Sequence, residues 1–143
     1  MPEGAPVFYW DASAILSVLV HDAHSSGAAA LARRRATHLV STLAYAEVSA
    51  VLSRLERERA LPSVLADAAR AQLRDGGPWR RLHLQPDLGE IDGLAGRWPL
   101  RGADLWHLAT AVTLSRELPE LQLATYDARL SAASAAVGLA LPN

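Results

Sequence analysis

The chain has 143 residues, of which 50% are hydrophobic, and its net charge at pH 7 is −1. A chain of this length is typical of a single domain that buries its own core. It contains no cysteine, which excludes a disulfide framework and a thiolate-ligated zinc site.

All 14 basic residues are arginine, so the chain has no lysine. This excludes P-loop nucleotide binding and Schiff-base chemistry, because both need a lysine amine. It also argues against receiver domains and haloacid-dehalogenase-type phosphatases, which combine their aspartates with a lysine. The near-neutral net charge gives no sign of general nucleic-acid binding, so any such binding must depend on local arginine clusters.

The N-terminal residues lack the basic segment of a signal peptide. The longest apolar runs, such as residues 12–20, are far shorter than a membrane span. We therefore expect a cytoplasmic protein that does not enter the membrane.

Strand and helix signals alternate along the first half of the chain. In order, the predicted elements are a strand at residues 7–10, a helix at 12–20, a helix at 27–36, a strand at 38–42 and a helix at 43–60. The last helix is the clearest, because apolar residues from Val48 to Leu55 recur at helical spacing. Asp11 stands at the start of the first helix.

The second half continues the same pattern. The predicted elements are a helix from Pro62 to Gly76, a strand at 79–84 with Leu82 and Leu84 inward, a short helix at 86–97, a helix at 104–118, a strand at 121–125, a helix at 127–137 and an edge strand at 139–141. Alternating strands and helices predict a mainly parallel central sheet covered on both faces. We therefore expect one domain over residues 1–143, an α/β protein with a three-layer α/β/α sandwich.

Four acidic residues from separate segments are predicted to meet at one edge of this sheet, because ligands gather beyond the carboxyl ends of parallel strands. Asp11 follows the first strand and Asp127 lies just beyond the strand at 121–125. Glu47 lies about one turn into a helix that leaves a strand, and Asp104 begins a helix. We call these residues the rim carboxylates: Asp11, Glu47, Asp104 and Asp127.

Each rim carboxylate also has an ordinary structural explanation. Aspartate is a favoured helix N-cap, and for Asp104 and Asp127 taken singly capping is the more common role. Capping explains Glu47 poorly, because it lies five residues after Thr42 and a capping box needs a separation of three. Four converging carboxylates without a nearby lysine repel one another, and a divalent cation relieves that repulsion. Oxygen ligands favour Mg²⁺ or Mn²⁺, which can activate water against a phosphodiester.

Four segments resemble the PIN-domain ribonucleases, and within them the VapC-like toxins of type II VapBC toxin–antitoxin systems. The matching segments are residues 9–14 (YWDASA), 41–48 (STLAYAEV), 101–111 (RGADLWHLATA) and 123–130 (LATYDARL). They occur in the family's order, and the chain has the family's size. The resemblance implies that the rim carboxylates bind the metal and are catalytic, and that Ser13 and Thr125 support them by hydrogen bonds.

The resemblance further implies a Mg²⁺- or Mn²⁺-dependent endoribonuclease that acts as a toxin, a cognate antitoxin as protein partner, and a homodimer. One alternative is a PIN-type nuclease of RNA processing or repair outside a toxin pair. Another is a non-catalytic metal-binding or RNA-binding module.

Several other polar residues are candidates for function. His107 lies three residues after Asp104 and could face the same site, but a histidine on an amphipathic helix is more often packed or solvated. Residues 33–35 and 80–81 are arginine clusters that could bind RNA phosphates, bind an acidic antitoxin segment, or only solvate the surface.

Overall fold

The computed structural model describes residues 4–141, so residues 1–3, part of the stretch in which we expect no signal peptide, lie outside it. Within the described residues the sheet has four strands, all parallel, in the order β3-β2-β1-β4. The strands are β1 (Val7–Trp10), β2 (Thr37–Ser41), β3 (Trp79–Leu82) and β4 (Leu121–Ala124). The predicted parallel α/β architecture is confirmed.

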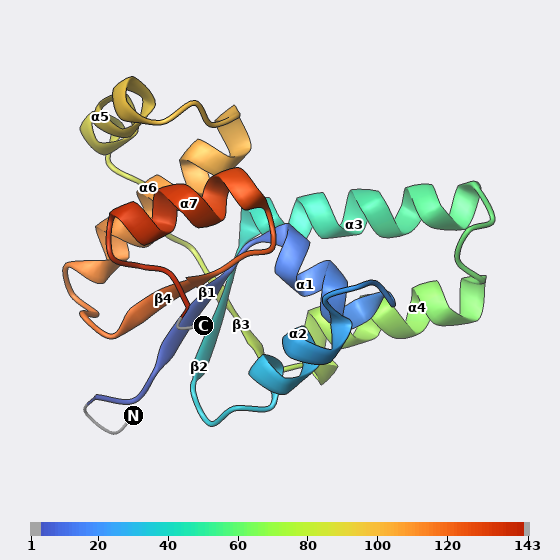
Figure 1. Ribbon diagram of the computed structural model, residues 1–143. Coiled ribbons are helices and arrows are strands. Elements are labelled where there is room, and N and C mark those ends of the chain that lie inside the picture. The colour runs from blue at the N-terminus through green and yellow to red at the C-terminus, as the bar shows by residue number, and fades with distance from the viewer. Residues whose placement is uncertain (1–3, 142–143) are drawn as a thin grey trace.

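Helices cover both faces of the sheet (Figure 1). They are α1 (Ala12–Leu19), α2 (Ser25–Ala32), α3 (Thr42–Arg57), α4 (Ser63–Ala71), α5 (Leu88–Arg97), α6 (Gly102–Ser115) and α7 (Ala128–Ala136), with a π-helical turn η1 (Gln72–Gly76) after α4. Helices α3 and α4 pack against each other and extend beyond the sheet.

Side-chain alternation along β1 builds the two apolar layers of the core. Phe8 and Trp10 pack with residues of α1, α3 and α4 on one face, and Val7 and Tyr9 pack with residues of α6 and α7 on the other. All four of these β1 residues are fully buried. The sandwich follows from this, because a central strand buried on both faces needs a helical layer on each side.

The register brings the carboxyl ends of three strands to the same level. Trp10 of β1 is aligned with Val40 of β2 and with Ala124 of β4. The chain leaves these strands into α1, α3 and α7, so these helices begin at a common rim of the sheet. This rim is the place where the sequence predicts a ligand site.

Several predicted elements differ in the structure. Helix α2 ends at Ala32 rather than at residue 36, because residues 33–36 turn the chain back into β2. The predicted strand at 139–141 is only a single bridge between Ala140 and Leu123. In β3 the buried side chain is Trp79, whereas Leu84 lies beyond the strand end. No helix within residues 4–141 is long and apolar enough to span a bilayer.

Candidate active site

Asp11 lies at the junction of β1 and α1, where it is the N-cap of the helix. Its Oδ1 accepts hydrogen bonds from the Ala14 backbone N–H (2.9 Å) and from the Ser13 hydroxyl (2.7 Å). Its Oδ2 accepts a hydrogen bond from the Thr125 hydroxyl (2.5 Å). The side chain is only 3% exposed, so these hydrogen bonds hold the carboxylate in one orientation.

Burial raises the pKa of the Asp11 carboxyl, because the charged form loses its hydration. The hydrogen bonds from Thr125, Ala14 and Ser13 oppose this rise, as does the nearby His107. Ionised Asp11 is therefore costly in the free protein, and a cation beside it would recover that cost.

Ser13 and Thr125 connect the loop after β4 to the loop after β1. The Thr125 oxygen accepts a hydrogen bond from the Asp127 backbone N–H (3.1 Å) while its hydroxyl donates to Asp11. The Ser13 oxygen accepts a hydrogen bond from the Tyr126 backbone N–H (3.0 Å). The structure places both hydroxyls against the carboxylates that they are predicted to support.

Asp127 is the N-cap of α7, and its Oδ1 accepts a hydrogen bond from the Leu130 backbone N–H (2.9 Å). Capping and a position at the rim are thus combined in one residue. Only Oδ1 is used by the cap, which leaves Oδ2 for another ligand.

Asp104 is not a helix cap. Helix α6 begins at Gly102 with Arg101 as its N-cap residue, so Asp104 lies within the first turn, and the predicted start at residue 104 is two residues late. Burial raises the pKa of its carboxyl, and the charges of Asp127, Asp11 and Glu47 raise it further, although His107 acts in the opposite direction. The other rim carboxylates are therefore close enough to repel Asp104.

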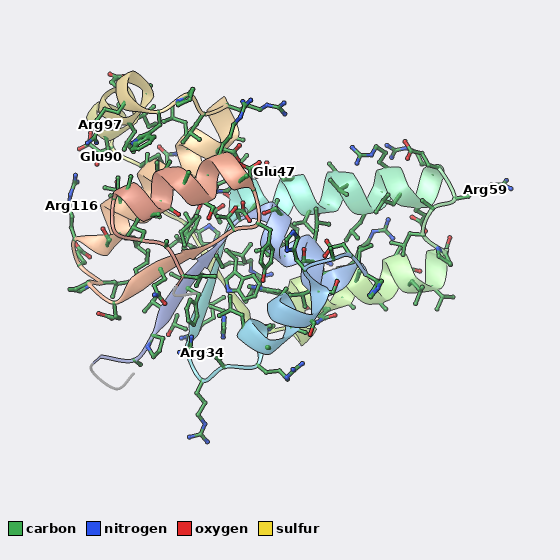
Figure 2. The ribbon with its side chains drawn as sticks, viewed as in Figure 1. Arg34, Glu47, Arg59, Glu90, Arg97 and Arg116 are labelled. Carbon is green, nitrogen blue, oxygen red and sulfur yellow. The ribbon has the colours of Figure 1, made fainter. Side chains whose placement is uncertain are left out.

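Glu47 reaches the rim from α3 (Figure 2). Ser41 caps this helix through a hydrogen bond from the Ala44 backbone N–H (3.0 Å), so Glu47 is free of a capping role. Its Oε1 lies 2.7 Å from Nε2 of His107, which comes from α6. The Glu47 side chain remains 33% exposed, so part of the carboxylate still faces the solvent.

A cavity of about 290 Å³ opens at this rim. Its lining consists of Arg101, Asp104, Asp127, Ala128 and Arg129. Both arginines are exposed, and within the described residues neither forms an ion pair with a carboxylate. The cavity therefore combines acids that can bind a cation with guanidinium groups that can bind a phosphate.

The donor set suits a hard divalent cation, because it is made of carboxylate oxygens that repel one another. No group of three or more histidine, aspartate or glutamate side chains within residues 4–141 is already arranged to hold a metal ion. Mg²⁺ usually keeps several waters and binds through one or two carboxylates, so it does not require three protein ligands.

His107 is predicted from the sequence to be packed or solvated, with metal ligation as the alternative. Its ring is 1% exposed, and both ring nitrogens are bonded, Nε2 to Glu47 and Nδ1 to the Tyr9 phenol (2.6 Å). The prediction that His107 is packed is therefore correct about burial, but it does not include the hydrogen bonds to Glu47 and Tyr9. Two sequence features together could have indicated this contact. The alternation along β1 turns Tyr9 toward α6, and His107 lies on the same helix as Asp104.

The arginine cluster at residues 33–35 lies far from the rim carboxylates. It precedes β2, whereas the rim lies beyond the carboxyl end of that strand. Figure 2 shows Arg34 and Glu47 at opposite ends of the sheet. The Arg34 guanidinium lies 5.0 Å from the centre of the Phe8 ring. This cluster therefore does not line the cavity at the rim, whereas Arg101 and Arg129 do.

Comparison with known proteins gives sequence relatives over almost the whole chain. No protein-family model matches. Ribonuclease VapC45 of Mycobacterium tuberculosis (strain CDC 1551 / Oshkosh) and Ribonuclease VapC49 of Mycobacterium tuberculosis (strain ATCC 25618 / H37Rv) are each 38% identical over 135 residues. The alignment covers 93% of this chain and 92% of each relative.

Solved structures share the fold at lower identity. PAE2754 from Pyrobaculum aerophilum has a TM-score of 0.63 at 21% identity, covering 98% of this chain and 91% of that one. The sarcin-ricin loop cleaving toxin VapC20 of Mycobacterium tuberculosis has a TM-score of 0.58 at 19% identity, with 88% and 94% covered. VapBC2 from Rickettsia felis, solved with a promoter DNA fragment, has a TM-score of 0.54 at 11% identity, with 85% and 99% covered.

Proposed function

Since the chain belongs to the VapC ribonucleases, the PIN-domain toxins of VapBC toxin–antitoxin pairs, we propose that the rim carboxylates are its catalytic metal site. The protein is a ribonuclease, and its reaction is hydrolysis of RNA phosphodiester bonds. We propose that this activity takes place in the cytoplasm. The rest of the proposal assigns roles to individual residues.

The observation that carries the proposal is that Asp104 and Asp127, which come from separate segments, line one cavity at the rim. Asp104 has a raised pKa that is due in part to Asp127, Asp11 and Glu47, which come from three other segments of the chain. Capping does not explain this arrangement, because Asp104 and Glu47 are not helix caps. A divalent cation bound between these carboxylates would relieve their repulsion.

Mg²⁺ or Mn²⁺ would be held by the rim carboxylates and would supply an activated water and stabilisation of charge on the phosphate. The protein's own part is to fix the carboxylates. Asp11 is held by three hydrogen bonds from Ala14, Ser13 and Thr125, and Asp127 is held by the N-terminus of α7. Such fixed ligands lose little conformational freedom when a cation binds.

Arg101 and Arg129 are placed to bind the RNA backbone. Both line the cavity that Asp104 and Asp127 also line. A guanidinium can form two parallel hydrogen bonds to a phosphate, so these side chains would orient a backbone phosphate beside the metal. Local arginines of this kind explain how a chain with a net charge of −1 can bind RNA.

A cognate antitoxin is the expected protein partner, because VapC proteins are the toxin halves of VapBC pairs. The rim is the natural target for inhibition, since a basic side chain would be attracted to its uncompensated carboxylates. We also propose a homodimer. Val64 and Leu65 of α4 are 78% and 54% exposed, and apolar side chains of this size are commonly covered in an assembly.

Cleavage of RNA by purified protein tests the catalytic assignment. Asp104→Asn and Glu47→Gln should each lower the rate in Mg²⁺ or Mn²⁺ by about a hundredfold or more, because each removes charge from the site. The double variant should be scarcely slower than either single variant, since residues that act as a unit are not additive. Asp92→Asn, an exposed position on α5, is the matched control.

The outcomes separate the possible functions. Wild-type rates in both single variants would refute the site assignment. RNA binding without metal-dependent cleavage by the wild type would instead indicate a binding module. A protein that cleaves RNA but has no antitoxin partner would indicate a nuclease of RNA processing or repair.

A further inference from the structure

A chain of buried hydrogen bonds leads from the centre of β1 to the Glu47 carboxylate. The Tyr9 phenol oxygen lies 2.6 Å from Nδ1 of His107, and Nε2 of the same ring lies 2.7 Å from Oε1 of Glu47. Tyr9 is fully buried and His107 is 1% exposed. Water therefore does not compete for either ring nitrogen of His107.

The direction of these hydrogen bonds follows from the chemistry of the groups. A phenol has an ordinary pKa of about 10 and is neutral near pH 7, so Tyr9 has one proton to donate. The Ser41 and Thr110 hydroxyls also lie close to the Tyr9 phenol.

The Tyr9 phenol and Nδ1 of His107 share one hydrogen bond, so Nδ1 is occupied by Tyr9. A carboxylate only accepts hydrogen bonds, so Nε2 carries a proton and donates it to Oε1 of Glu47. Each link fixes the next, and His107 has no nitrogen left to bind a metal. The ring is held with Nε2 toward Glu47 and Nδ1 toward Tyr9.

Glu47 needs such a support more than Asp11 and Asp127 do. Asp11 and Asp127 are short side chains held by helix N-termini. Glu47 has an additional methylene group, and its carboxylate hydrogen-bonds with the His107 ring. A glutamate that must become ordered when a cation binds loses rotamer freedom, which costs affinity.

We propose that Tyr9 and His107 are positioning residues, which orient Glu47 so that Oε1 stays bound to His107 and Oε2 is presented to the cation. This assignment rests on the proposed metal site. Neither residue touches the metal or the RNA in this arrangement. Both act through Glu47, in the way that outer-shell partners orient metal ligands.

The protein offers a matched control on the opposite face of the sheet. His38 is also buried, at 3% exposure, and its ring also hydrogen-bonds with an aromatic residue, the Trp10 indole N–H (3.0 Å). Its other nitrogen lies 3.0 Å from the Arg34 carbonyl oxygen, away from the rim. Replacing His38 should therefore destabilise the fold without affecting metal binding.

The test measures Mn²⁺ affinity of the RNA-free protein by calorimetry and single-turnover cleavage, for Tyr9→Phe, His107→Leu, His107→Gln and His38→Gln. Tyr9→Phe and His107→Leu should weaken Mn²⁺ binding and slow cleavage by about 10–100-fold. His107→Gln keeps an N–H that can reach Glu47 and should recover part of both losses. His38→Gln should bind Mn²⁺ like the wild type, even if its melting temperature falls.

Two further measurements make the result specific. Long-range ¹H–¹⁵N spectra of the metal-free protein should show a proton on Nε2 of His107, as donation to Glu47 requires. In a Glu47→Gln background, His107→Leu should cause no further loss of Mn²⁺ affinity, because the residue acts through Glu47.

Wild-type Mn²⁺ affinity in both Tyr9→Phe and His107→Leu would overturn the proposal, as would a full additional loss in the Glu47→Gln background. Failure of the proposed function looks different. If only the proposed function fails, the wild type binds Mn²⁺ but cleaves no RNA. The effects of Tyr9→Phe and His107→Leu on Mn²⁺ affinity then still test the positioning role. A wild type that binds no Mn²⁺ would overturn both.

Discussion

Replacing Asp11 with alanine should destabilise the fold, whereas replacing it with asparagine should not, although both changes should abolish cleavage. Asp11 accepts hydrogen bonds from the Ala14 backbone N–H, the Ser13 hydroxyl and the Thr125 hydroxyl. Alanine removes all of these acceptors. Asparagine keeps one carbonyl oxygen for Ala14 and Ser13, and its amide can donate to the Thr125 oxygen once that hydroxyl turns.

The size of the alanine effect follows from these contacts. Loss of an N-cap costs about 1 kcal/mol. Thr125 is only 8% exposed, and a buried hydroxyl without an acceptor costs about 1–3 kcal/mol. Removing the buried carboxylate offsets part of this loss of stability, because burial opposes its ionisation. We expect a net loss of about 2 kcal/mol, or about 6 °C in melting temperature for a chain of this size.

Asparagine should leave the melting temperature of the metal-free protein unchanged or higher, since it caps as well as aspartate and carries no charge. Added Mn²⁺ should distinguish the wild type from both Asp11 variants. At a hundredfold excess over its dissociation constant, Mn²⁺ should stabilise the wild type by about 2.7 kcal/mol. Both Asp11 variants should lose most of that gain.

The assay is thermal unfolding of the three proteins, with chelator and with Mn²⁺. Equal destabilisation by asparagine and alanine in chelator would refute the reasoning, because it would mean that the buried charge of Asp11 itself stabilises the fold. Equal Mn²⁺ shifts in all three proteins would remove Asp11 from the metal site and leave it as a cap.

Two further predictions concern the cavity at the rim. The folded-state pKa of Asp104 is raised, so its contribution to stability is present at low pH and is lost as pH rises through that raised pKa. In chelator, the melting temperature of Asp104→Asn should therefore gain on the wild type as pH rises, and a constant difference would contradict this. Arg129→Gln, tested in the cleavage-deficient Asp104→Asn background, should weaken RNA binding and lower its salt dependence by about 0.7 in the logarithmic slope, the value for one phosphate contact on a single strand. Arg35→Gln, at the other end of the sheet, should leave that slope unchanged, and equal slopes for the two variants would remove Arg129 from the RNA path.

The fold was predictable because its signals are local and repeated. The apolar run at 7–10 and the helical spacing from Val48 to Leu55 each reflect burial of one face, which no distant contact overrides. The boundaries were less predictable. Helix α2 ends early because residues 33–36 must reverse the chain into β2, and that need is set by the position of the strand.

The candidate site was predictable to the extent that it depends on topology. Asp11 and Asp127 follow strands whose ends the parallel register aligns. Orientation was not predictable. The hydrogen bond between His107 and Glu47 joins residues 60 positions apart on two helices, and the two arginines of the cavity differ from those at 33–35 only in where the fold places them. Side chains at such distances meet through packing, for which a single sequence has no periodic signal.

Capping and metal binding are commonly weighed as alternative roles for an aspartate, but in this fold one geometry serves both. In a parallel sheet the chain leaves each strand at the same rim, and the helix that follows begins there. A cap at that junction places a carboxylate at the rim and uses one oxygen for the helix, as Asp127 does with Leu130. Asp104 lies in the first turn of α6 but is not its cap, and Glu47 lies farther along α3, so these two become the diagnostic residues because capping does not explain their presence. If their replacement left metal binding intact, the aspartate caps alone would not justify a metal site.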